Sequence, residues 1–99
     1  GTGIQPKKGD LVSIHYLGMF VDGRPLDNSY ERGKPFKFRL FTGEVIEGMD
    51  EGISLMKEGG KARLIIPSDL AYGKKQHGNI PPYSTLIFEI ELISVEKLD

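Results

Sequence analysis

The chain has 99 residues, of which 38% are hydrophobic and 27% charged, with no cysteine and a formal net charge of -1. This length and composition are those of one globular domain with a modest core. Because the charges balance and no apolar run approaches the roughly 20 residues of a bilayer span, we expect neither nucleic acid as a partner nor a membrane span. The lack of cysteine excludes disulfides, thiolate metal sites and a cysteine nucleophile.

The first residues, Gly1-Thr2-Gly3, include no start methionine and no secretory signal. We therefore expect residues 1–99 to be a single domain excised from a longer chain. The compartment stays open, since the bacterial cytoplasm and the cell envelope both fit the sequence.

Alternation of apolar and polar residues predicts that most of the chain is β-structure. Val12, Ile14 and Tyr16 alternate with polar neighbours, the period of two that is typical of a strand with one face toward a core. Asp22-Gly23 is typical of a tight hairpin turn, and residues 28–35 have the composition of a loop. The pattern predicts strands at 12–20, 25–27, 36–40, 62–66 and 86–92.

The period changes to that of a helix between Ile46 and Met56, where apolar residues recur three and four positions apart. Gly59-Gly60 is a plausible end for this helix. Gly48 and Gly52 lie inside it, and each costs about 1 kcal/mol relative to alanine, so we expect another element to pack closely there or the helix to be short. One helix with amphipathic strands predicts an α+β fold in which a curved antiparallel sheet wraps around the helix.

Signatures of phosphate-binding, acyl-transfer and metal chemistry are missing from the sequence. The two histidines, His15 and His77, lack the spaced partners of a metal site or a catalytic pair, and no P-loop, dinucleotide-binding or nucleophile-elbow motif is present. No metal and no cofactor is therefore expected.

Aromatic and apolar residues near polar loops remain as candidates, although each one taken singly also fits an ordinary core position. Asp27 differs from them, because it follows Leu26 on a predicted strand. It is either exposed at the end of that strand or a carboxylate kept near an apolar pocket. A buried carboxylate needs partners, and Tyr16 and Arg32 are the candidates that the sequence offers.

In their order and spacing, four segments closely resemble the FKBP-type peptidyl-prolyl cis-trans isomerases, the macrolide-binding immunophilins: VSIHYLGMF, DGRPLDNSY, KPFKFRLFTGEVIEGMDEGISLMKEGGKARLIIPSDLAYG and IPPYSTLIFEIELISV. The resemblance extends over residues 7–95 and is closer to bacterial than to eukaryotic members. It implies a five-stranded antiparallel sheet wrapped around one short helix, and catalysis of rotation about X–Pro bonds during protein folding.

The resemblance also implies the residues of a shallow proline-binding pocket. It assigns polar contacts to the Asp27 carboxylate, the Tyr72 hydroxyl and the backbone N–H of Ile46, and it places Ile80 on a loop that overhangs the pocket. The implied apolar contacts to substrate are Tyr16, Leu26, Phe36, Val45, Ile46, Met49, Ile80 and Phe88.

The chain departs from the common family pattern around this pocket. Met49 stands where many members have a tryptophan, and Leu26 where many have phenylalanine, so rigid aromatic surface is lost and macrolide affinity should fall. The overhanging loop is one residue shorter than in the human-type members, and Asn79 replaces a common apolar residue. These differences put substrate preference in question more than activity.

Three functions remain open from the sequence. The leading one is a peptidyl-prolyl isomerase whose partners are proline-containing peptides, unfolded or partly folded proteins, and macrolides of the rapamycin type. The second is a binding or chaperone module with little turnover, which Met49 and the short loop would favour. The third is a structural domain of a larger envelope or cytoplasmic protein.

Overall fold

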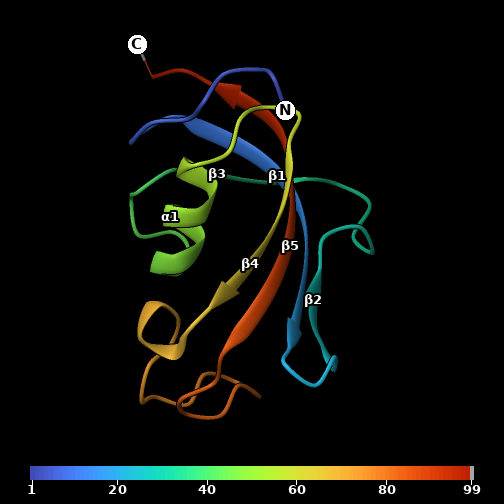
Figure 1. Cartoon of the computed structure of the whole chain (residues 1–99), viewed down its shortest axis with the longest axis vertical. Coiled ribbons are helices and arrows are strands. Elements are labelled where there is room, and N and C mark those ends of the chain that lie inside the picture. Colours follow the sequence, from blue (N-terminus) through green and yellow to red (C-terminus); the bar gives the residue numbers. More distant parts are fainter. Residues whose placement is uncertain (99) are drawn as a thin grey trace.

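The computed structural model describes residues 1–98 and contains five strands, one α-helix and one 3₁₀ turn (Figure 1). In chain order these elements are β1 (Leu11–Phe20), β2 (Pro25–Asn28), β3 (Phe36–Arg39), α1 (Glu47–Ser54), β4 (Lys61–Ile66), η1 (Ser68–Leu70) and β5 (Leu86–Glu96). The predicted α+β class is confirmed. No helix within residues 1–98 has the length and apolar character needed to cross a bilayer.

The sheet is antiparallel, with the strand order β2-β1-β5-β4 and with β3 also paired to β1. Because β5 pairs with β1 along its whole length, β2 and β3 share the opposite edge of β1. There β3 pairs with residues 11–14 and β2 with residues 17–19, and the chain between β2 and β3 leaves the sheet as a loop. This pairing also explains why β5 continues to Glu96, past the predicted end at Leu92.

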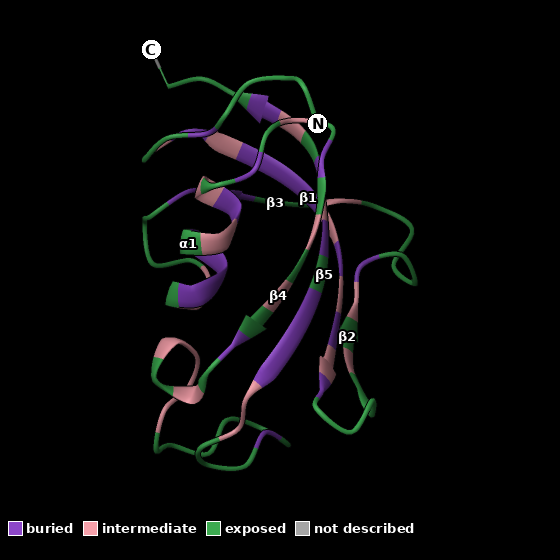
Figure 2. Ribbon diagram, in the orientation of Figure 1, coloured by how far each residue is buried: buried purple, intermediate pink, exposed green. Residues whose placement is uncertain are grey.

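The core lies between the sheet and α1, and its residues come from the alternate strand positions that the sequence pattern marks as apolar (Figure 2). Burying one such large side chain stabilises the fold by about 1.5–3 kcal/mol. The apolar side chains that are at most 1% exposed are Val12, Ile14, Phe38, Leu40, Ile53, Leu86 and Leu92.

Helix α1 is shorter than its apolar repeat predicts. It begins at Glu47 and ends at Ser54, so Met56 lies just beyond it but is still buried. A Cβ atom on Gly48 would lie 2.5 Å from Cγ2 of Ile66, and one on Gly52 would lie 2.4 Å from Cδ1 of Leu64. Strand β4 is therefore the closely packed element that the two glycines indicated, and their small size lets the helix approach the sheet.

Candidate active site

A cavity of about 180 Å³ opens where the sheet meets the start of α1. Its wall is mainly apolar and is assembled from four strands, the β3–α1 connection, α1 and the segment after η1. The residues that line it are Ile14, Tyr16, Leu26, Asp27, Phe36, Glu44, Val45, Ile46, Met49, Tyr72 and Phe88.

Every site residue predicted from the sequence lies in this wall except Ile80. The side chain of Ile80 is only 5% exposed and belongs to the hydrophobic core. Its backbone exchanges two hydrogen bonds with that of His77, at 3.0 and 2.8 Å, which close a tight turn inside the loop between Tyr72 and Tyr83. The buried side chain of Ile80 therefore anchors the loop to the hydrophobic core, and Ile80 is not among the residues that line the cavity.

Two lining residues were missed by the sequence analysis. Ile14 lies two positions before Tyr16 on β1, so the same alternation that places Tyr16 on the inner face could have identified it. Glu44 lies in the connection before α1, where no periodicity applies, and its carboxylate accepts the backbone N–H of Arg39 at 2.9 Å.

Aromatic rings form one side of the cavity. The ring of Tyr16 on β1 lies edge-on to Phe36 of β3, with 6.1 Å between ring centroids, and 6.0 Å from the ring of Phe88 on β5. Aromatic pairs at such distances stabilise by about 0.5–1.5 kcal/mol beyond their buried area. Antiparallel pairing of β1 with both β3 and β5 brings the three rings together, although they are far apart in sequence.

Asp27 forms the polar edge of the cavity, and both partners predicted for it are confirmed. The Tyr16 hydroxyl donates to Asp27 Oδ2, and Arg32 Nη1 donates to Asp27 Oδ1 at 2.6 Å. Arg32 Nη2 also donates to the Tyr16 hydroxyl at 2.8 Å, and the guanidinium lies 5.5 Å from the centre of the Tyr16 ring. The three side chains form a closed network at the boundary between cavity and solvent.

The network fixes the charge of Asp27. Burial opposes ionisation, but the hydrogen bonds from Tyr16, Arg32 and the backbone N–H of Asn28 outweigh it, so the pKa of Asp27 lies below its usual value. Burial, reinforced by the Asp27 carboxylate, raises the pKa of the Tyr16 hydroxyl. At neutral pH the cavity thus presents an ionised carboxylate and a neutral phenol.

Tyr72 and Ile46 also line the cavity. Tyr72 is half-buried, and its ring stacks on that of His77 with centroids 4.1 Å apart and an 8° angle between planes. Ile46 immediately precedes α1, a position whose N–H has no intrahelical acceptor. The Tyr72 hydroxyl and the Ile46 N–H are the two donors that the resemblance assigns to substrate, and both residues line the cavity.

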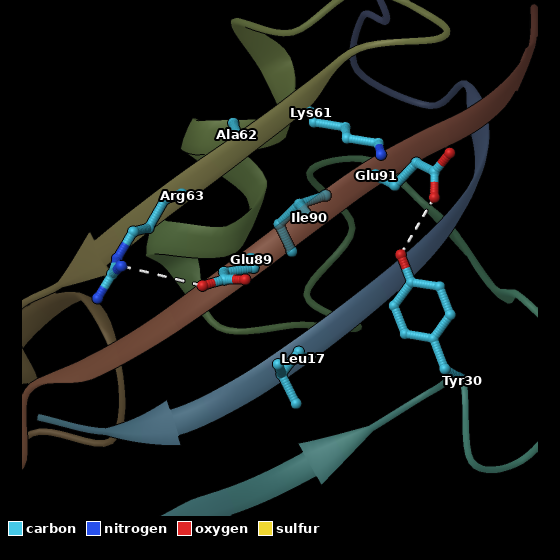
Figure 3. Close-up of a pocket in the computed structure, with 8 residues that line it drawn as sticks. All are labelled: Leu17, Tyr30, Lys61, Ala62, Arg63, Glu89, Ile90 and Glu91. Atoms are coloured by element: carbon cyan, nitrogen blue, oxygen red, sulfur yellow. Dashed lines mark hydrogen bonds and ion pairs between the residues drawn. The ribbon is translucent and has the colours of Figure 1, made fainter. Parts of the chain in front are cut away.

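No group of three His, Asp or Glu side chains within residues 1–98 is arranged to hold a metal ion. A larger depression of about 440 Å³ lies on the outer face of the sheet, but its wall is charged (Figure 3). It is lined by Leu17, Tyr30, Lys61, Ala62, Arg63, Glu89, Ile90 and Glu91.

Known proteins are similar to this chain in both sequence and fold. The FKBP-type peptidyl-prolyl cis-trans isomerase family model matches residues 2–93. The peptidyl-prolyl cis-trans isomerase Fkbp12 of Drosophila melanogaster is 50% identical over 92 residues, which cover 92% of this chain and 85% of that protein. FK506-binding protein 2 of Yarrowia lipolytica is 54% identical over 92 residues, covering 92% of this chain and 64% of that protein.

A bacterial relative matches equally well. The FKBP-type isomerase FkpA of Escherichia coli is 49% identical over 96 residues, or 97% of this chain, but the match spans only 35% of the FkpA sequence. The crystal structure of FkpA superposes with a TM-score of 0.91 at 49% identity, covering 97% of this chain and 44% of that one. The crystal structure of AtFKBP13 gives 0.90 at 44% identity, covering 95% of this chain and 85% of that one.

These matches confirm the resemblance, including the five-stranded sheet around one short helix, but they do not favour a bacterial over a eukaryotic origin. With a family model along nearly its whole length, and with about half its residues identical to those of a relative of similar size, the chain belongs to the FKBP-type peptidyl-prolyl cis-trans isomerase family.

Proposed function

We propose that this chain accelerates rotation about X–Pro bonds in proline-containing peptides and in unfolded or partly folded proteins, and that the cavity beside α1 is where it does so. The observation that carries this proposal is the small aromatic cavity with a single ionised carboxylate at its edge. A volume of about 180 Å³ is below the roughly 300–1,000 Å³ of sites for drug-sized ligands, and it suits one proline ring with its neighbouring carbonyl.

The reaction explains why the site needs no nucleophile. Rotation about an X–Pro bond breaks only amide resonance, with a barrier of about 18–20 kcal/mol, and no covalent bond is exchanged. The twisted amide is less dipolar than either planar form. A water-excluding cavity therefore disfavours the planar amide relative to the twisted one.

Individual residues have distinct roles in this proposal. Tyr16, Phe36 and Phe88 exclude water from the proline ring, and Met49 supplies a flexible apolar surface beneath it. The Tyr72 hydroxyl and the Ile46 N–H donate to substrate carbonyls, holding the peptide partly along the rotation. Asp27, kept ionised by Arg32, orients the Tyr16 phenol at the cavity edge.

Exchange NMR on a short X–Pro peptide tests the proposal without a coupled protease. The wild-type chain should increase the exchange rate between cis and trans peptide, and Tyr72→Phe and Asp27→Ala should each reduce kcat/KM by about tenfold or more, equivalent to the loss of one good hydrogen bond. Glu89→Gln, on the outer face of the sheet, is the matched control and should retain the wild-type rate. A wild-type chain that does not accelerate exchange would contradict the proposal.

A second candidate function is recognition without efficient turnover, which Met49 in the cavity wall favours because it replaces rigid aromatic surface. One relative bears the name FK506-binding protein, so a macrolide of the FK506 or rapamycin type is a suitable probe for this chain. Macrolide binding that abolishes catalysis would place both in the same cavity. Binding with no catalysis to abolish would favour the recognition module.

The chain spans 35% of the length of the curated FkpA relatives. We therefore also propose, and do not state as shown, that a whole protein containing this domain has the same activity and clients. The bacterial origin and the compartment remain predictions from the sequence.

A further inference from the structure

Strand β1 has a gap in its hydrogen-bonded ladder beside the cavity. On the edge that faces away from β5, β3 pairs with residues 11–14 and β2 with residues 17–19. Tyr16 lies between the two paired segments, where the chain between β2 and β3 leaves the sheet. Its backbone N–H and C=O would have no strand partner there, although buried backbone groups need one.

Ser29 fills this gap. Its side chain is fully buried, and its Oγ accepts the Tyr16 N–H at 2.7 Å, while its own backbone N–H donates to the Tyr16 C=O at 3.0 Å. Both polar groups of the Tyr16 backbone are thus held by one residue. The opposite end of Tyr16 is the hydroxyl that donates to Asp27, so Ser29 fixes the base of the side chain whose tip lines the cavity.

The Ser29 hydroxyl also forms a hydrogen bond with His15, whose side chain lies on the outer face of the sheet. His15 Nδ1 lies 2.9 Å from Ser29 Oγ. A serine hydroxyl has one hydrogen and two lone pairs, one of which accepts the Tyr16 N–H. In one histidine tautomer the hydroxyl donates to His15 Nδ1, and in the other the Nδ1–H donates to Ser29 Oγ while the hydroxyl donates to the Tyr16 C=O at 3.3 Å. The hydrogen bond with His15 therefore limits the rotation of the hydroxyl.

The His15 ring is covered by Tyr30. The two rings are stacked, with centroids 4.4 Å apart and planes 13° from parallel. The Tyr30 hydroxyl donates to Glu91 Oε1 at 3.1 Å, on the side of the sheet away from α1, where Glu91 of β5 lies opposite His15 of β1 (Figure 3). This contact keeps the loop after β2 against the outer face of the sheet.

We propose that His15 is a positioning residue of the isomerase site, acting through Ser29 on Tyr16 and thereby on Asp27. The proposal rests on the proposed function, because its consequence for catalysis is measured in the same reaction. His15 touches no substrate, and its hydrogen bond orients the Ser29 hydroxyl that fixes the Tyr16 backbone. Loss of this hydrogen bond loosens the Tyr16 phenol relative to Asp27 and Arg32.

Two substitutions of His15 separate its hydrogen bond from its packing. His15→Phe keeps a ring to stack on Tyr30 but removes Nδ1, and we expect kcat/KM to fall about fivefold, within the range of coupling between contacting residues. His15→Asn carries a polar atom close to the Nδ1 position, and we expect it to restore most of the loss although it removes the ring stack. Because His15 is only half-buried, both variants should fold.

A double-mutant cycle identifies the route of the effect. In a Tyr16→Phe background the phenol is gone, so His15→Phe should have no further effect on kcat/KM. Equal losses in the two backgrounds, or no loss in the wild-type background, would overturn the proposal. Glu89→Gln, one row along the same outer face, should have no effect in either background.

A spectroscopic readout keeps this test separate from the proposed function. The Tyr16 hydroxyl proton, shared with Asp27, should give a slowly exchanging downfield NMR signal in the wild-type chain and in His15→Asn. That signal should broaden or disappear in His15→Phe while the melting temperature remains within a few degrees of wild type. If the chain proves inactive toward X–Pro peptides, this signal alone decides: a signal unchanged in His15→Phe overturns the proposal, and its loss supports it.

Discussion

Arg32 joins the two oxygen-bearing side chains at the edge of the cavity: its Nη1 lies 2.6 Å from Asp27 Oδ1 and its Nη2 2.8 Å from the Tyr16 hydroxyl. The side chains of Arg32 and Asp27 are 45% and 44% exposed, so their ion pair is screened and adds little to stability. Its consequence is geometric, because a planar guanidinium fixes the two oxygens relative to each other.

Replacing Arg32 by lysine should therefore affect catalysis more than folding. The ammonium group keeps the charge but cannot bond both oxygens in a fixed plane, so we expect kcat/KM to fall about three- to tenfold while the free energy of unfolding changes by less than about 1 kcal/mol. Exchange NMR and urea unfolding measure the two quantities. Arg24→Lys is the matched control, since Arg24 also pairs with an exposed aspartate, Asp22, but does not line the cavity. A loss of stability in proportion to the loss of activity would contradict this prediction.

Gly48→Ala should destabilise the fold, although alanine is the better helix former. Propensity favours alanine by about 1 kcal/mol. Against this, the new Cβ would lie 2.5 Å from Cγ2 of Ile66, a stiff β-branched side chain that is only 2% exposed. Overpacking of this kind costs about 1–3 kcal/mol, so we expect a net loss in urea unfolding.

The exposed helix residue Glu51 supplies the control for that experiment. Glu51→Ala gains helix propensity at an exposed position and should change stability by no more than about 0.5 kcal/mol. A Gly48→Ala chain as stable as wild type would mean that β4 shifts easily away from α1.

Asp50 should make the fold less stable as the pH rises. Its side chain is buried on α1, and this burial raises the pKa of the carboxyl. The nearby charge of Glu44 raises the pKa further, whereas the hydrogen bond from the Phe41 N–H, 2.9 Å from Oδ1, lowers it; the net pKa is raised. A carboxyl with a raised folded-state pKa stabilises the fold below its unfolded pKa of about 3.9, and this contribution is lost as the pH rises through the folded-state pKa.

Asp50→Asn tests the effect, because asparagine keeps an acceptor for Phe41 N–H but cannot ionise. The melting temperature of the variant relative to wild type should increase from pH 4 to pH 7. Asp69→Asn, at an exposed position of η1 outside the cavity, is the control for the loss of one aspartate charge. A constant difference between Asp50→Asn and wild type at all pH values would rule out the titration of Asp50 as the cause.

Met49→Trp should strengthen macrolide binding. The chain has no tryptophan, and Met49 is a flexible side chain in the cavity wall with 5% exposure. A rigid indole offers more contact area at a lower entropic cost, so we expect the dissociation constant for an FK506-type macrolide to fall about tenfold. Calorimetry measures it, and the new fluorophore should report binding directly.

Leu55→Trp is the matched fluorescence control, since Leu55 lies just after α1, is 80% exposed and does not line the cavity. Its emission should not respond to the macrolide. An unchanged or weaker affinity in Met49→Trp would indicate that the added volume closes the cavity.

Much of this architecture follows from local patterns in the chain. Alternation along β1 separates the inward Tyr16 from the outward His15, and spacing alone places Met49 on the inner side of a helix. The φ of 89° at Gly23 agrees with the turn that Asp22-Gly23 predicts. The partners of Asp27 were also predictable, because a carboxylate beside an apolar pocket must be paired with donors.

Other features depend on contacts between distant segments. The sequence could not show that the Ile80 side chain is buried in the core, that Glu44 lines the cavity, or that α1 ends at Ser54. None of these features leaves a periodic signal in the sequence. The same holds for Ser29, whose position beside Tyr16 exists only because β2 and β3 pair with different parts of one edge of β1. Local patterns determined whether each side chain points to the core or to the outer face of the sheet, because side-chain direction follows from backbone geometry. Strand pairing decided which side chains contact one another, because it joins residues that are remote along the chain.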